Sequence, residues 1–148
     1  MSTAGGVATS IDRALSVGAT AMQIFVKNNM QWFAAAPFTP AELAAFHEHP
    51  GRKELRSVFA HSGYMINLAA ANPEFAEKSR LALKDELIRA DQLRLPFLVL
   101  HPGAHMGAGE AQGIAKIAAG LDAVLEEIPE VKTRVALETT AGQGTSLG

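Results

Sequence analysis

The sequence predicts an α/β fold, a partial TIM (β/α)8 barrel of about four parallel strands with outer helices. Strand-like and helix-like segments alternate along the whole chain, which is typical of a parallel sheet with helices packed outside it. Three of the strand-like runs end at a polar residue, and these residues fall roughly 40 positions apart, the length of one strand-plus-helix unit. Four strands are half of a barrel whose usual length is about 250 residues.

Composition and charge narrow the class of protein. The 148 residues are 48% hydrophobic and 19% charged, which is ordinary for a globular domain with a real core. A formal net charge of −2 gives no overall basic field for nucleic acid, although bound cations at a local site could still recruit DNA. The absence of cysteine rules out disulfides and thiolate metal ligands, and fits a reducing cytoplasm.

No segment of the sequence predicts a membrane partner. No apolar run approaches the roughly 18 residues of a membrane span, and the N-terminus lacks a charged-then-apolar signal pattern. We therefore expect a cytoplasmic protein.

Apolar spacing and start signals predict the helices. Thr39-Pro40-Ala41-Glu42 has the residues of a capping box with proline at the first helical position, and Asn72-Pro73 is a second cap-and-proline pair. Gly18 suits the position after the first helix. The expected helices cover 7–15, 39–50, 72–94 and 110–128.

Short apolar runs predict the strands, which cover 20–26, 57–60, 96–100 and 134–137. The run from Pro96 to Leu100 is almost entirely apolar, which favours a strand buried on both faces. Pro102-Gly103 then breaks the chain, so His101 stands at the carboxyl end of that strand. Ligands bind at this end of the strands in parallel α/β folds.

His61, His101 and Glu138 each follow one strand directly. Parallel crossovers place the carboxyl ends of successive strands at the same edge of the sheet, so these side chains are expected to converge. A single histidine at a strand end is more often a hydrogen-bonded structural residue, but three such residues at matching positions favour a metal. Two imidazoles and a carboxylate predict a zinc-type site with room for a water.

The other histidines are weaker candidates. His105 stands four residues after His101, but Pro102-Gly103 forbids the helix on which that spacing would form a ligand pair. We predict that His105 either supports a metal ligand or contacts a phosphate, or else makes a plain hydrogen bond within its loop. His47 and His49 stand near a helix C-terminus, where positive charge suits the dipole, and are expected at the surface.

Several stretches, taken in order, resemble the N-terminal half of the endonuclease IV family, the zinc-dependent apurinic/apyrimidinic endonucleases (AP endonuclease family 2) built on a TIM barrel. The matching stretches are Ser2-Thr3-Ala4-Gly5-Gly6, Lys27-Asn28 with Gln31-Trp32, His61 with Tyr64-Met65-Ile66-Asn67-Leu68, His101-Pro102-Gly103 with His105, and Glu138 with Ala141-Gly142-Gln143-Gly144. Each motif alone is a moderate signal, and their order and spacing together make a strong one.

The resemblance implies a deoxyribonuclease IV-like DNA-repair hydrolase. Its members cut the phosphodiester 5′ to abasic sites in double-stranded DNA with zinc-activated water, using three zinc ions. Carried over to this sequence, His61 and His101 would be terminal ligands of one zinc. Glu138 would bridge it to a second, so that its catalytic role is to hold the metals.

The resemblance also implies DNA-contacting residues in two loops. Tyr64 and Met65 would lie in the loop that the family pushes into the kinked duplex beside the flipped-out sugar. Met30 stands where the family commonly has an inserting arginine and Met65 where leucine is usual, while Gln31 belongs to the first DNA-contacting loop. Methionine keeps an apolar wedge at these positions, but at Met30 the cation is lost.

The family's first strand and its later Asp, His and Glu ligands have no counterpart in the 148 residues. We therefore expect one partial-barrel domain spanning 1–148 that retains ligands for one zinc and has reduced or no nuclease activity. The intact family is expected to be monomeric, whereas a half-barrel with two unpaired sheet edges is expected to self-associate.

Two other functions stay open at this point. A metal-dependent sugar isomerase or epimerase of the xylose isomerase-like barrel superfamily also places His and Glu at strand ends, but has no obvious use for the 30–32 and 64–65 loops. A zinc-poor, non-catalytic DNA-binding remnant is the other alternative.

Overall fold

A computed structural model describes residues 1–34 and 36–148 of the chain. Its strands form one four-stranded sheet in the order β1-β2-β3-β4, and every neighbouring pair is parallel. The strands are β1 (Ala21–Ile24), β2 (Ser57–His61), β3 (Phe97–Leu100) and β4 (Arg134–Leu137). The sheet order therefore follows the chain order, as expected of part of a (β/α)8 barrel, and the predicted fold class is confirmed.

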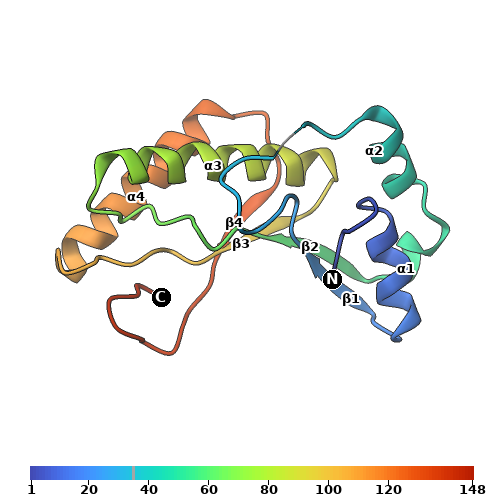
Figure 1. Cartoon of the computed structure of the whole chain (residues 1–148), viewed down its shortest axis with the longest axis horizontal. Coiled ribbons are helices and arrows are strands. Elements are labelled where there is room, and N and C mark those ends of the chain that lie inside the picture. Colours follow the sequence, from blue (N-terminus) through green and yellow to red (C-terminus); the bar gives the residue numbers. More distant parts are fainter. Residues whose placement is uncertain (35) are drawn as a thin grey trace.

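One helix precedes the first strand, further helices connect the strands, and the helices cover one side of the sheet (Figure 1). They are α1 (Thr9–Ser16), α2 (Pro40–His47), the short 3-10 helix η1 (Pro50–Glu54), α3 (Pro73–Gln92) and α4 (Glu110–Glu127). The two long helices, α3 and α4, lie side by side, and Glu127 of α4 forms ion pairs with Arg80 and Lys84 of α3. None of the helices in the described part of the chain is long and apolar enough to cross a membrane.

Both predicted helix caps are present. The Thr39 side chain accepts the Glu42 N–H and the Glu42 carboxylate accepts the Thr39 N–H, which completes the capping box. The Asn72 side chain accepts the N–H groups of Glu74 and Phe75 at 2.8 and 3.2 Å. These bonds satisfy amide groups that have no partner inside the helix, so the local sequence determines where α2 and α3 begin.

The core lies between the sheet and its helices. Alternate residues of the first three strands are buried there: Met22, Ile24, Val58, Ala60, Leu98 and Leu100. On the opposite face the rings of Phe59 and Phe97 stack with centroids 4.9 Å apart, yet Phe97 and Val99 are only half-buried. The prediction that the third strand is buried on both faces is therefore wrong, because no helix of the described chain covers this second face (Figure 1).

Several element ends differ from the sequence prediction, among them the end of α2, which is His47 rather than residue 50. The first strand is Ala21–Ile24 rather than 20–26, and the 3-10 helix Pro50–Glu54 was not predicted. Helix α3 ends at Gln92, and Arg94 follows with φ of 53°. Arg94 takes the left-handed conformation that usually requires glycine, so no residue type in this stretch signals the stop.

Candidate metal centre

Three polar side chains meet at the carboxyl edge of the sheet. His61 is the last residue of β2, His101 directly follows β3, and Glu138 directly follows β4. Val99 pairs with His61 on one side and with Ala136 on the other. Because residues two apart along a strand point to the same face, all three polar side chains project from one face at one edge.

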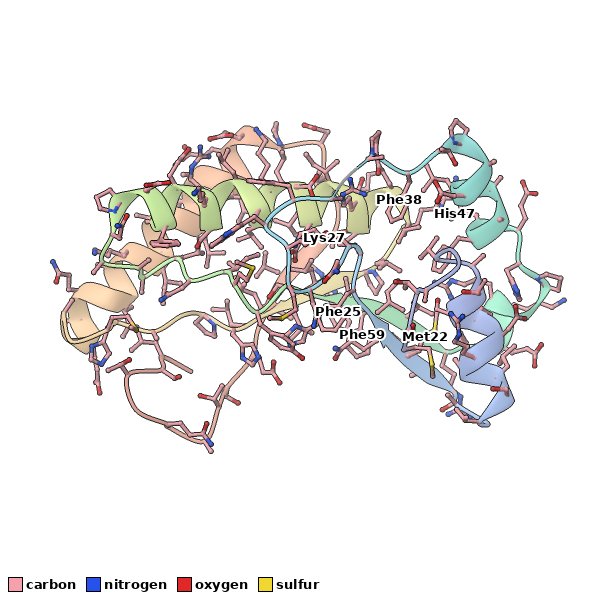
Figure 2. All side chains as sticks on the ribbon, viewed as in Figure 1. Met22, Phe25, Lys27, Phe38, His47 and Phe59 are labelled. Atoms are coloured by element: carbon pink, nitrogen blue, oxygen red, sulfur yellow. The ribbon has the colours of Figure 1, made fainter. Side chains whose placement is uncertain are left out.

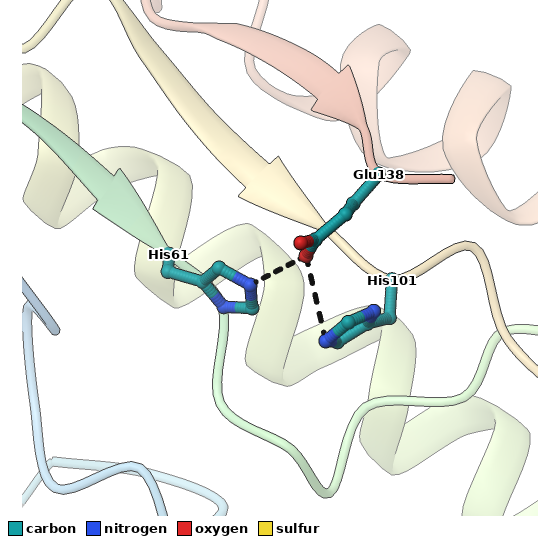
Figure 3. Close-up of side chains that lie close together, drawn as sticks. All are labelled: His61, His101 and Glu138. Carbon is teal, nitrogen blue, oxygen red and sulfur yellow. Dashed lines mark hydrogen bonds and ion pairs between the residues drawn. The ribbon is translucent and has the colours of Figure 1, made fainter. Parts of the chain in front are cut away.

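The three side chains contact one another across β3 (Figure 3). The Oε2 atom of Glu138 lies 2.9 Å from the Nε2 atom of His61 and 3.5 Å from the Nε2 atom of His101. The two imidazole centroids are 5.0 Å apart. One nitrogen from each ring and one carboxylate oxygen all lie within 4.8 Å of one another, close enough to share an ion.

The hydrogen bonding of His61 indicates that this group suits a cation. Its Nδ1 atom lies 2.8 Å from the carbonyl oxygen of Ser62, which can only accept, so Nδ1 carries a proton. In neutral imidazole Nε2 is then an acceptor, yet it faces the Glu138 carboxylate oxygen at 2.9 Å. Two acceptors at that distance need a proton or a metal ion between them.

The electrostatics of Glu138 agree with a ligand role. The hydrogen bond from His61, helped by the charges of His101 and His61, lowers the pKa of the Glu138 carboxyl below its ordinary value. Glu138 is therefore ionised at neutral pH and offers an anionic oxygen. His61 is buried, whereas about two-fifths of the side-chain surface of His101 and of Glu138 is exposed, so the cluster is open to solvent.

The donor set fits zinc. Zinc accepts imidazole nitrogen and carboxylate oxygen and is commonly held by three protein ligands with a fourth position open. A ligating histidine usually donates its other ring N–H to a carboxylate, a backbone carbonyl or a water, and His61 donates to the carbonyl of Ser62. A search of the described residues for three or more histidine, aspartate or glutamate side chains close enough to hold one ion finds His61, His101 and Glu138.

Tyr64 lies beside the cluster. Its side chain is 58% exposed, and its ring centroid is 5.8 Å from that of His61 and 6.2 Å from that of His101. The Phe25 ring packs edge-on against Tyr64 at 5.6 Å and supports it. A large aromatic side chain is thus presented to solvent next to the candidate metal ligands.

Met65 points elsewhere. It is half-buried and lines a groove of about 420 Å³ together with Trp32 and Phe75. The Trp32 and Phe75 rings lie 6.2 Å apart, so Trp32 packs against α3. The second loop therefore presents Tyr64 to solvent more fully than Met65.

Met30 and Gln31 lie in the loop after β1. Met30 is 66% exposed, and its N–H is accepted by the Asn28 side chain at 2.9 Å. Gln31 is also exposed, while its carbonyl accepts a hydrogen bond from Lys27. Both side chains are therefore free to meet a partner.

His105 makes a loop hydrogen bond. Its Nδ1 atom accepts the Gly109 N–H at 3.1 Å, just before α4 begins, which is one of the roles expected for it. It does not join the three-residue cluster, and a phosphate contact for it stays a prediction.

The surface placement of His47 and His49 is wrong, because both are half-buried and His49 lies 3.2 Å from Asp12.

Sequence reasoning missed one buried ion pair near the site. Lys27 of the loop after β1 and Glu86 of α3 contact at 2.7 Å and are almost completely buried. The available signal was Glu86 itself, which stands on the buried side of α3 between Leu83 and Leu87.

Comparison with known proteins identifies the family. Residues 11–148 match the family model described as xylose isomerase-like TIM barrel. The chain belongs to that family. Within it, the whole chain is 48% identical to a probable endonuclease 4 of Chloroflexus aggregans and 49% identical to one of Chloroflexus aurantiacus. These alignments cover 51% and 52% of the relatives, so the chain spans about half the length of the curated relatives it matches.

Solved structures agree with the barrel fold. The crystal structure of endonuclease IV from Thermus thermophilus matches with a TM-score of 0.82 and 32% identity, over 100% of this chain and 53% of that one. The resemblance to endonuclease IV is thus confirmed. A D-tagatose 3-epimerase-like protein matches with a TM-score of 0.72 over 97% of this chain and 53% of its own, but at 16% identity. That likeness shows the fold alone.

Proposed function

We propose that this chain carries part of the metal centre and of the DNA-contacting surface of an endonuclease that cuts the phosphodiester 5′ to abasic sites in duplex DNA. The observation that carries the proposal is the convergence of His61, His101 and Glu138 at one edge of the sheet. Tyr64 lies exposed beside them. In this proposal, the enzyme acts on abasic sites in the cytoplasm, as part of base excision repair.

The proposed metal is zinc, held by the two histidine Nε2 atoms and a Glu138 oxygen. When bound, zinc supplies Lewis acidity and hydroxide near neutral pH for attack on the phosphodiester. Glu138 acts as a ligand in this proposal. A general base works best with a pKa near the operating pH, whereas the pKa of Glu138 is lowered, so its carboxylate is a poor proton acceptor and a good ligand.

The residues proposed to contact DNA are Met30, Gln31, Tyr64 and Met65. Exposed apolar side chains can wedge between base steps, and Met30 and Tyr64 are the two most exposed of these large apolar side chains. Extruding a nucleotide is cheapest where no base remains to unpair or unstack, which would favour abasic sites. His105 is proposed to contribute no more than a phosphate contact from its neighbouring loop.

Nuclease function is favoured over sugar isomerisation by the relatives. Proteins that are 41% to 49% identical over the whole chain are named probable endonuclease 4, whereas the solved epimerases are 16% and 12% identical. Because this chain holds ligands for one zinc in its described cluster, we propose that it binds a single zinc weakly and cuts DNA slowly or not at all without the remaining ligands.

Zinc titration and DNA binding with the purified chain test the proposal together. We expect about one zinc per chain, lost in His101→Ala and kept in His105→Ala. We also expect tighter binding to an abasic-site duplex than to the intact duplex, with the preference reduced in Tyr64→Ala. Equal binding to both duplexes, or epimerisation of a ketohexose by the zinc-loaded chain, would contradict the proposal, and turnover comparable to a full-length relative would contradict the expected low activity.

A further inference from the structure

A buried ion pair lies between the loop after β1 and helix α3. The Nζ atom of Lys27 is 2.7 Å from Oε1 of Glu86, and the two side chains are 3% and 1% exposed. Figure 2 labels Lys27 near the middle of the molecule, next to α3. Neither residue belongs to the candidate metal cluster. Because the pair is buried, it differs from ordinary surface ion pairs, which contribute little to stability.

The pair joins two loops. The Glu86 carboxylate accepts the N–H of Gly63 at 3.0 and 3.2 Å, and Lys27 donates to the carbonyl of Gln31 at 2.5 Å. We call residues 27–32 the first loop and residues 62–67 the second loop. One carboxylate on α3 therefore binds a cation from the first loop and an amide from the second.

The two loops also pack closely on this pair. A Cβ atom added at Gly63 would lie 3.1 Å from Oε1 of Glu86, 3.2 Å from Nζ of Lys27 and 3.2 Å from the carbonyl oxygen of Asn29. Most contacts that Cβ atoms make in proteins are longer than these three distances. Glycine at position 63 thus lets the backbone of the second loop approach both the ion pair and the backbone of the first loop.

Stability alone is a weak reason for such a pair. Burial raises the pKa of Glu86, while Lys27 and the Gly63 N–H oppose that rise. Removing two charges from water carries a large free-energy cost, and well-packed apolar replacements are often as stable or more stable. What an apolar pair could not supply is directional bonding to Gly63 and Gln31, which holds the loops in one arrangement.

We propose that Lys27 and Glu86 are positioning residues that hold the first and second loops at one relative position, so that Met30 and Tyr64 meet DNA together. The DNA part of this inference rests on the proposed function. The loop part rests on the contacts of Gly63, Gln31 and the pair itself.

The test replaces the pair by neutral side chains of similar size in Lys27→Met/Glu86→Leu. Trp32, the sole tryptophan of the sequence, ends the first loop and reports on it by acrylamide quenching of fluorescence. We expect the quenching constant to rise about twofold and the affinity for an abasic-site duplex to fall at least about tenfold, because small displacements of contacting groups are costly. Zinc affinity should stay within about twofold, because the ligands stand on strand ends.

The matched control is Lys84→Met/Glu127→Leu, which removes the 2.7 Å pair between α3 and α4. It should change neither the Trp32 quenching constant nor the affinity for the abasic-site duplex. If the first double variant does not fold, Glu86→Gln keeps the shape and is measured in the same way. Unchanged Trp32 quenching in the folded variant would overturn the proposal. If the parent chain does not prefer abasic DNA, the proposed function fails, while the quenching result still decides whether the pair couples the loops.

Discussion

The Nε2 atom of His61 and the Oε2 atom of Glu138 lie 2.9 Å apart, although the two residues are 77 positions apart in the sequence and the strand β3 runs between theirs. The contact forms because both residues stand at the carboxyl ends of parallel strands and point to the same face. Since the other nitrogen of His61 donates to Ser62, the contact needs a proton or a metal ion between its two atoms. A metal ion there could be shared with His101.

Glu138→Gln should weaken zinc binding at least about tenfold, because the substitution removes the anionic ligand and keeps the size of the side chain. Isothermal titration of the metal-free chain with zinc measures the change. Glu110→Gln, an exposed position in the first turn of α4, is the control and should bind zinc like the parent. Equal affinity in all three proteins would show that Glu138 is not a ligand.

Zinc affinity should fall as the pH is lowered from about 7.5 to about 5.5. Imidazole must be deprotonated to bind a metal, so protons compete with zinc for imidazole ligands in general. The lowered pKa of Glu138 keeps its carboxylate ionised through this range, so loss of the Glu138 charge does not cause the fall. Titrations at several pH values check this, and an affinity independent of pH would argue against imidazole ligands.

The sequence predicted those features that depend on local patterns. Alternation of strands and helices indicated the parallel sheet, and residues standing directly after strands indicated the three-residue cluster, because the geometry of parallel strands carries this information over long distances. Cap residues indicated the starts of α2 and α3 because their bonds are local: Thr39 and Asn72 bond to amides two or three positions away.

Features that depend on tertiary packing were missed. Glu86 stands among apolar positions of α3, but nothing local shows that Lys27, 59 positions earlier in the sequence, would meet it. The half-buried state of Phe97 and Val99 depends on what covers their face of the sheet, which a run of apolar residues does not reveal. Arg94, just after α3, takes a left-handed conformation that its residue type does not predict.

Gly103→Ala should destabilise the chain by about 2 kcal/mol or more, since an added Cβ combines a clash with backbone strain. Gly103 has φ of 132°, and its Cβ would lie 2.5 Å from Oδ1 of Asn67. That oxygen accepts the N–H groups of Ala69 and Ala104, so it cannot move away freely.

Urea unfolding of Gly103→Ala and Gly107→Ala separates the two costs. Gly107 also has a positive φ, 91°, but a Cβ there would meet nothing within 4 Å, so Gly107→Ala carries backbone strain alone and should cost about 1 kcal/mol. Equal losses for both variants would contradict the role assigned to Asn67.

Asn72→Ala should lower the free energy of unfolding by about 1 kcal/mol, because the first turn of α3 loses its side-chain acceptor. The N–H groups of Glu74 and Phe75 both depend on the Asn72 oxygen. Asn72→Asp keeps an acceptor and adds a negative charge that suits a helix N-terminus, so it should match or exceed the parent in urea unfolding. Equal stability of the alanine and aspartate variants would refute this account.

Self-association of the chain should run through the edges of the sheet. In the described structure β1 pairs only with β2 and β4 only with β3, and unpaired edges are templates for further pairing. Leu137 of β4 is 54% exposed and adds apolar surface there. Leu137→Lys should therefore shift the chain toward monomer in light scattering, because an edge lysine opposes pairing.

The control is Val17→Lys, at the 72% exposed Val17 after α1, which should leave the distribution of oligomeric states unchanged. A parent chain that is monomeric at all concentrations would contradict the expectation.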